Sequence, residues 1–329
     1  MRILKLDQRH GVLKAIIRSA DDLVVLSYII EPGDRLVAYT RRKIVVGVSQ
    51  EIRTVKLGVS VEKVELEETS LGISGKIDSS SDENVPLHKY HTIYLKPKTG
   101  FVLFKSAFLK FQVEMVRKSQ AKSPKVFICV YEEGYAIFYK ITNYSLSRMY
   151  EMKERVSGKR FKDAATREAF LDKLSKHILD ENRKGGWDLF IVAGKAIDNE
   201  DLKKNLSSAE SVTYETVSYA DTGLKELINK DRINELLKGT KISSQRELIK
   251  EYLGGISDGD KDYVYGKENI VSALSVKAPV QALVTREFIT QNKNLIESID
   301  RNGAEIIVFD EADESLEQLI GFGGVLLKF

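Results

Sequence analysis

The chain has 329 residues, of which 43% are hydrophobic and 30% charged, with a net charge of +3; this composition is typical of globular domains, and the length favours two or three of them. The longest apolar runs are far too short to cross a bilayer and the first residues show no signal-peptide pattern, so we expect a cytoplasmic protein that binds no membrane. Cys129 is the single cysteine, which excludes an internal disulfide and a cysteine-based zinc site.

Residues 1–120 are expected to form a small β-barrel domain. The region contains several short stretches in which apolar and polar side chains alternate, with turns between the stretches. Such alternation predicts strands with one buried face. Ser106–Val116 is a predicted helix that closes the unit, and Ser119–Pro124 is a predicted linker. The predicted strands are Met1–Leu6, Gly11–Ile17, Arg35–Tyr39, Thr54–Lys63, Leu71–Lys76 and His91–Leu95.

Residues 125–255 are expected to form an α/β domain, because predicted strands and helices alternate along them. Val126–Tyr131 and Tyr135–Ile141 flank a turn and predict a hairpin. Trp187–Ala193, which is apolar apart from Asp188, predicts a strand buried on both faces. Val212–Ser218 is a further predicted strand. The predicted helices are Asp163–Asn182, Thr222–Lys238 and Gln245–Leu253, the last of which is expected to stop at Gly254-Gly255.

Residues 258–329 are expected to form a compact α-β-α sandwich after a linker at Ile256–Gly259. Short helical and extended patterns alternate here too, so the sequence as a whole predicts a multi-domain α+β protein. The predicted helices are Lys267–Val276, Thr290–Arg301 and Ser315–Gly321, and the predicted strands are Val280–Thr285, Ala304–Phe309 and Val325–Phe329.

Charge is distributed unevenly along the chain. Residues 1–120 carry 20 Lys and Arg against 14 Asp and Glu, and residues 121–255 carry 24 against 21. Residues 256–329 reverse this balance, with 7 against 13. A polyanion would be attracted to the first two thirds, whereas the acidic end suits a different partner; ordinary scatter of charges over solvated faces is the alternative.

The sequence excludes several kinds of catalytic chemistry. Gly194-Lys195 lacks both the preceding glycine and the following hydroxyl of a phosphate-binding loop, so we expect this chain to bind no nucleotide. His88 and His91 are three residues apart, a spacing that would place them on opposite faces of a strand and does not suit one metal ion. No nucleophilic set of Ser, His and Asp is indicated.

Two basic stretches are candidate RNA contacts. The first, Arg41–Lys43 with Arg53, lies where two strands of the barrel meet their connecting loop. The second, Lys159-Arg160, follows a Ser-Gly pair in a loop before the long helix of the central domain. Guanidinium and ammonium groups at such tips bind phosphates, and guanidinium groups also stack on bases. A solvated strand end or loop is an equally good interpretation of each. The candidate residues are Arg41, Arg42, Lys43, Arg53, Lys159 and Arg160.

Asp21, Asp22 and Asp34 are the candidate ligands for a divalent metal ion. Clustered carboxylates are the ligands that Mg²⁺ and Ca²⁺ prefer. Adjacent carboxylates are also common in turns and helix caps, and we favour that interpretation.

The same regions belong to a longer pattern that resembles the Pelota family. The matching segments occur in the family's order across the whole chain, and their end resembles that of the short archaeal form. They are Asp21–Leu23, Tyr28–Ile30, Gly33–Arg35, Thr40–Lys43, Tyr90–Ile93, Leu95–Pro97, Phe101 with Lys105, Tyr265-Gly266, Gly303-Ala304, Leu319–Gly321 and Gly324–Phe329.

The resemblance implies an Sm-like β-barrel, a central domain similar to that of class-I release factors, and a C-terminal domain similar to kink-turn-binding proteins. It implies recognition of stalled ribosomes at the A site and their rescue by subunit splitting, in mRNA surveillance of the no-go decay type. The implied partners are rRNA and mRNA, a translational GTPase related to the tRNA-delivering elongation factor, and an ABC-type recycling ATPase. We expect the protein itself to be a monomer.

The resemblance leaves a catalytic alternative open. The Gly-Gly-Gln of release factors occurs nowhere in the sequence, so we do not expect a peptidyl-tRNA hydrolase. The family has been credited with a divalent-metal-dependent endoribonuclease activity in the barrel domain, which here could use only Asp21, Asp22 and Asp34. A plain RNA-binding adaptor is a third possibility, favoured if no GTPase binds the chain.

Overall fold

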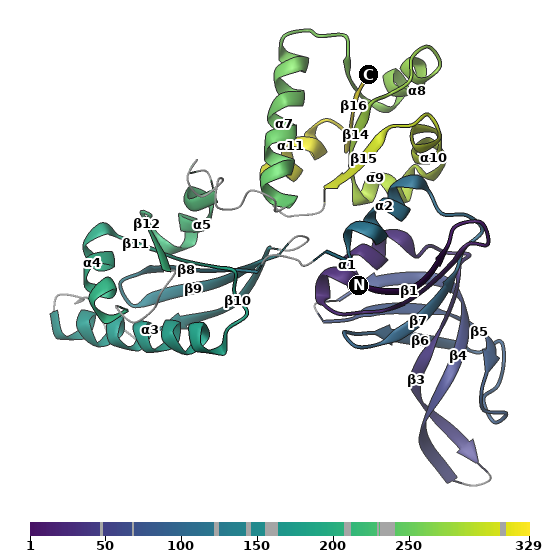
Figure 1. The fold of residues 1–329 in the computed structure, drawn as a ribbon, viewed down its shortest axis with the longest axis horizontal. Helices are drawn as coiled ribbons and strands as arrows, with labels where there is room; N and C mark the ends of the chain where they lie inside the picture. Colours follow the sequence, from purple (N-terminus) through teal and green to yellow (C-terminus); the bar gives the residue numbers. More distant parts are fainter. Residues whose placement is uncertain are drawn as a thin grey trace. The chain divides into compact units, whose positions relative to one another are not determined.

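The computed structural model describes residues 1–46, 49–67, 69–121, 125–142, 146–154, 164–206, 212–228, 230, 241–309 and 314–329 (Figure 1). Three sheets are present, one in each segment for which a domain was predicted. By their contacts, Met1–Lys122 and Ile249–Phe329 form one compact unit, and Ser123–Leu248 form a second. Within the described ranges, no helix is both long enough and apolar enough to span a bilayer.

The first sheet has seven strands in the order β1-β2-β7-β3-β4-β5-β6, and every pair is antiparallel. The sheet curls so far that Thr40 Oγ1 of β3 lies 3.2 Å from His91 Nε2 of β6, which is the curvature of a small barrel. The elements are β1 (Arg2–Asp7), β2 (Val12–Ile16), α1 (Ala20–Ile29), β3 (Arg35–Val46), β4 (Ser49–Leu66), β5 (Leu71–Ser80), β6 (Tyr90–Leu95), β7 (Gly100–Phe104) and α2 (Lys110–Lys118).

The predicted strands of this sheet are present, but three of them are longer than the sequence indicated. β3, β4 and β5 each extend beyond the predicted alternation. β7 and α1 were not predicted. Helix α1 buries residues all around its circumference, Asp21 and Asp22 included, and therefore has no apolar stripe by which a sequence pattern could reveal it.

The last part of the chain forms a four-stranded sheet in the order β13-β16-β14-β15, in which only β14 and β15 are parallel. The elements are α7 (Lys241–Ser257), β13 (Tyr263–Tyr265), α8 (Lys267–Leu274), β14 (Gln281–Thr285), α9 (Arg286–Gln291), α10 (Lys293–Arg301), β15 (Glu305–Phe309), α11 (Glu314–Gly321) and β16 (Val325–Lys328).

Two predictions for this region are wrong. Helix α7 does not stop at Gly254-Gly255, and the predicted linker Ile256–Gly259 lies partly inside it. The ring of Tyr263 packs so closely on Gly255 that a Cβ there would lie 2.2 Å from the Tyr263 Cδ2 atom. Glycine is therefore required inside this helix for packing rather than for termination. The single helix predicted at Thr290–Arg301 is two, α9 and α10, which are separated at Asn292.

The first and last sheets share one compact unit because α2 packs against the C-terminal segment. Phe111 of α2 and Tyr28 of α1 belong to the same buried apolar cluster as Ile296 and Ile299 of α10. The carboxylate of Asp300 accepts hydrogen bonds from the backbone amides of Lys110 (2.8 Å) and Phe111 (3.0 Å). It thus caps the N-terminus of α2 from 190 residues further along the chain.

The second unit is a mixed five-stranded sheet in the order β10-β9-β8-β11-β12, with apolar clusters on both faces. Helices α3 and α4 contribute to one cluster and α5 to the other, in agreement with the strand predicted at Trp187–Ala193 to be buried on both faces. Cys129 is fully buried in β8. The elements are β8 (Val126–Glu132), β9 (Tyr135–Ile141), β10 (Leu146–Lys153), α3 (Ala164–Lys184), β11 (Leu189–Gly194), α4 (Ala196–Asn205), β12 (Val212–Thr216) and α5 (Ala220–Ile228).

Candidate nucleic-acid interface

The outer parts of β3 and β4 form a two-stranded ribbon, residues 39–46 and 49–56, which we call the β3–β4 ribbon. The pairing of β3 with β7 covers Arg35–Ala38 only, and the pairing of β4 with β5 begins at Leu57. Beyond these positions β3 and β4 remain paired with each other, from Tyr39–Lys56 to Val46–Ser49. Figure 1 shows the ribbon running past the other strands of the sheet. A projecting ribbon of this kind can enter a groove of a folded nucleic acid.

One face of the ribbon carries cations next to a free aromatic ring. The register pairs Tyr39 with Lys56, Arg41 with Thr54, and Lys43 with Ile52. Alternate residues share a face, and all six of these side chains are exposed, Tyr39 at 64% and Ile52 at 60%. Cations beside an uncovered ring suit phosphate binding combined with base stacking. We call this set the exposed ribbon face: Tyr39, Arg41, Lys43, Ile52, Thr54 and Lys56.

Arg42 and Arg53 lie on the opposite face, which turns towards the segment after β5. Arg53 is ion-paired with Glu51 at 2.8 Å and with Asp82 at 3.2 Å, and the hydrogen bond to Glu51 is the main reason that the pKa of its guanidinium is raised. Burial, reinforced by the charge of Arg42, lowers the pKa of His91 to about 4. His91 is therefore neutral at pH 7.

The structure thus divides the predicted RNA-binding residues. Arg41 and Lys43 lie on the exposed ribbon face, whereas Arg42 and Arg53 lie behind it. Tyr39 and Lys56 were missed by sequence reasoning, because their position beside Arg41 follows only from the register of β3 and β4. The other two predicted residues, Lys159 and Arg160, lie outside the described residues.

The three candidate metal ligands are engaged in other roles. The Asp22 carboxylate accepts hydrogen bonds from the backbone amides of Arg18 (2.6 Å) and Ser19 (3.3 Å) at the start of α1, and it pairs with the amino group of Met1 at 2.5 Å. Asp21, also in the first turn of α1, is buried. These are the helix-cap positions that the sequence also suggested.

Asp34 is part of a buried ion pair rather than a cluster of carboxylates. Its Oδ2 atom lies 2.7 Å from the ammonium of Lys105, which also contacts Glu31 at 2.9 Å. Burial raises the pKa of Asp34, and the hydrogen bond from Lys105 opposes this effect. Across the described residues, no group of three or more His, Cys, Asp or Glu could hold a metal ion, so Asp21, Asp22 and Asp34 do not come together as ligands.

Comparison with known proteins agrees with this architecture. Residues 1–120 match the Pelota N-terminal domain family. The sequence is 26% identical to the Pelota homologue of Thermococcus kodakarensis and 27% identical to that of Pyrococcus horikoshii, and each alignment covers 100% of this chain and 99% of the relative.

The fold is similar to two solved structures over the full length of this chain. The Pelota protein of Thermoplasma acidophilum superposes with a TM-score of 0.73 at 16% identity, covering 99% of that chain. Dom34 of S. cerevisiae, a translation termination-like factor involved in RNA quality control pathways and interacting with Hbs1, superposes with a TM-score of 0.53 at 19% identity, covering 98% of that chain. The match of residues 1–120, the full-length relatives and the shared fold together bear out the predicted resemblance to the Pelota family.

Proposed function

We propose that the protein recognises stalled ribosomes and promotes their rescue by subunit splitting, as part of mRNA surveillance in the cytoplasm. The observation that carries this proposal is the exposed ribbon face, in which Arg41, Lys43 and Lys56 share one face with Tyr39 on a ribbon that projects from a Pelota-type N-terminal domain.

The ribbon suits an RNA-lined site for physical reasons. Its two strands hold the three cations in a fixed arrangement, so that little conformational entropy is lost when they bind phosphates. The ring of Tyr39 offers a stacking surface for an unpaired base. Arg53 and Arg42 support this face from behind and would contact RNA at the edges of the ribbon. Lys159 and Arg160 remain predicted contacts of the central domain.

The proposed role needs partners because the chain itself offers no means of hydrolysing a nucleotide or a peptidyl-tRNA. Its sequence contains neither a phosphate-binding loop nor a Gly-Gly-Gln. Yeast Dom34, which shares the fold, interacts with Hbs1, and we infer that this chain likewise works with a translational GTPase. An ABC-type ATPase would then supply the energy for splitting the subunits.

A charge-reversal experiment tests the ribbon assignment. The double substitution Arg41→Glu and Lys43→Glu should weaken binding to ribosomes stalled on a truncated mRNA, and the salt dependence of log Kd should become shallower by roughly 1.5, since each lost phosphate contact contributes about 0.7–0.9 to the slope. Sedimentation of the full chain with stalled ribosomes at several salt concentrations measures both effects.

Lys14→Glu is the matched control, because Lys14 is an exposed lysine on β2 of the same sheet and lies outside the ribbon. Its reversal should leave the salt slope unchanged. Equal binding by the wild-type chain and the double variant would contradict the proposal.

A further inference from the structure

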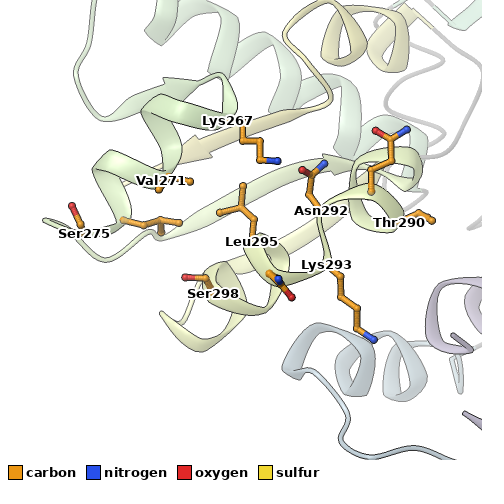
Figure 2. Close-up of a pocket in the computed structure, with 11 residues that line it drawn as sticks. Lys267, Val271, Ser275, Thr290, Asn292, Lys293, Leu295 and Ser298 are labelled. Carbon is orange, nitrogen blue, oxygen red and sulfur yellow. The ribbon is translucent and has the colours of Figure 1, made fainter. Parts of the chain in front are cut away.

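The C-terminal segment contains a pocket of about 650 Å³ between α8 and the α9–α10 turn (Figure 2). This volume falls within the range of roughly 300–1,000 Å³ that is typical of ligand sites. Val271 and Leu274 of α8 form one wall, and Leu295 of α10 forms another. Leu274 and Leu295 also pack against the buried core, so the walls belong to rigid elements.

The pocket presents apolar surface to solvent. Val271 is 52% exposed, although it lies on the same helix as the fully buried Ile270. The described residues that line it include no aromatic side chain. An uncovered aliphatic wall of this kind is stabilised when an aliphatic side chain of a partner covers it.

The charge at the pocket is opposite to that of its surroundings. Residues 256–329 carry 13 Asp and Glu against 7 Lys and Arg, yet the described residues that line the pocket include no Asp or Glu and two lysines. One of them, Lys293, has its ammonium 3.3 Å from Glu31. The other, Lys267, is exposed, forms no ion pair with the described residues, and extends from α8 towards Asn292 in Figure 2.

We propose that this pocket binds a peptide segment of a partner protein that presents an aliphatic side chain next to a carboxylate. The aliphatic group would cover Val271 and Leu295, and the carboxylate would pair with Lys267. The carboxylate would also accept the second hydrogen of the Asn292 side-chain amide, whose other hydrogen is donated to the carbonyl of Phe288. A peptide fits better than RNA, because the described residues that line the pocket offer one unpaired cation, Lys267, and no ring on which a base could stack. The pocket and the exposed ribbon face come from different segments, so this proposal goes beyond the ribosome contact and does not depend on it.

Peptide selection with the full chain tests the proposal. A phage library of random linear peptides is selected on the wild-type chain and counter-selected on Val271→Glu, an exposed position where the change leaves the core intact. The surviving peptides should combine Asp or Glu with Leu, Ile or Val. Their affinity, measured by fluorescence anisotropy, should fall by about tenfold with Lys267→Glu, because the charge pair then becomes repulsive.

Two matched variants separate the pocket from general effects of charge and hydrophobicity. Lys261→Glu reverses another exposed lysine of the same segment, and Val276→Glu places a carboxylate at an exposed valine outside the pocket. Both should bind the selected peptides as the wild type does. The proposal is overturned if no peptide survives counter-selection, if the survivors lack acidic residues, or if they tolerate Lys267→Glu. It is also overturned if an RNA oligonucleotide, rather than a peptide, loses binding with Val271→Glu.

Discussion

Arg42 and Arg53 lie directly opposite each other in the β3–β4 ladder, on the side of the ribbon that faces away from Tyr39 and Lys43. Like charges in this position repel each other. Glu51 and Asp82 offset the repulsion, since both carboxylates contact the guanidinium of Arg53. Because Asp82 follows β5, the second contact also fastens the projecting ribbon to the rest of the sheet.

The substitution Asp82→Asn should loosen the ribbon without unfolding the domain. Hydrogen bonds from Asn84, and then from Arg53, hold the pKa of Asp82 below its usual range, so its carboxylate is charged at pH 7. Because Arg53 is partly exposed and water screens the pair, we expect little loss in global stability. Amide hydrogen exchange should be faster in the ribbon. The exposed neighbour Glu83 provides the control Glu83→Gln, and equal exchange in both variants would contradict the role of Asp82.

Replacing Tyr39 by alanine should weaken ribosome binding even though the change removes no charge. Stacking of a base on a tyrosine contributes about 1–3 kcal/mol, which corresponds to a rise in Kd of roughly fivefold or more. Binding of the full chain to stalled ribosomes, measured at fixed salt, checks this. Tyr94→Ala removes a ring of similar exposure from β6 and should have no such effect. A salt slope altered by Tyr39→Ala would argue against stacking.

His91 should make the barrel segment less stable as the pH falls. Its pKa is lowered from 6.5 to about 4 in the folded protein by burial and by the nearby charge of Arg42. Between these two values the unfolded chain binds more protons than the folded chain, so the free energy of unfolding rises with pH across this window. The stabilisation is complete above pH 6.5 and is lost as the pH approaches 4.

The substitution His91→Gln separates this effect from that of the carboxylates, which also titrate in acid. Glutamine keeps a hydrogen-bonding group near Thr40 and carries no titrating proton. The difference in unfolding free energy between wild type and variant, from urea titrations at pH 4.5 and pH 7, should therefore change in favour of the variant at the lower pH. A difference that does not vary with pH would refute this role.

Asp34 should prove to be a structural residue rather than a metal ligand. Its side chain and that of Lys105 are only 7% and 2% exposed. Removal of one partner from a buried ion pair costs about 3 kcal/mol or more when the other charge is left unpaired, and Glu31, 2.9 Å from Lys105, should keep the cost below that. Asp34→Asn should lower stability accordingly, and the double variant Asp34→Asn/Lys105→Met should recover part of the loss. Mg²⁺ should leave the Tm of both the wild type and Asp34→Asn unchanged. A rise of the wild-type Tm in Mg²⁺ that disappears in the variant would favour the endoribonuclease alternative instead.

Period-two alternation located six of the seven strands of the first sheet and missed β7. It could not reveal helix α1, whose residues Ala20–Ile29 are buried on all sides. The same pattern predicted too short a β3. Arg41, Arg42 and Lys43 interrupt the alternation of apolar and polar side chains, although the backbone remains extended through them.

The sequence predicted that the candidate interface is basic, but not all of the residues that form it. A basic strand end near residue 41 was visible in the sequence, whereas the pairing of Tyr39 with Lys56 depends on the register across a hairpin. The ion pair of Asp34 with Lys105 joins residues 71 positions apart, so local sequence patterns carried no signal for it. The helix-cap role of Asp22 was recognisable, because it involves only the residues just before it.

The bond from Asp300 to the amide of Phe111 means that one compact unit is assembled from the two ends of the chain, with residues 123–248 between them. During synthesis the inserted unit has all its residues available before the C-terminal strands emerge, and domains tend to fold as units in the order of their synthesis. Phe111 of α2 and Tyr28 of α1 therefore stay uncovered on the N-terminal segment until α10 has been translated. Premature termination upstream of α10 would leave this apolar surface exposed, and we expect such truncated products to be aggregation-prone.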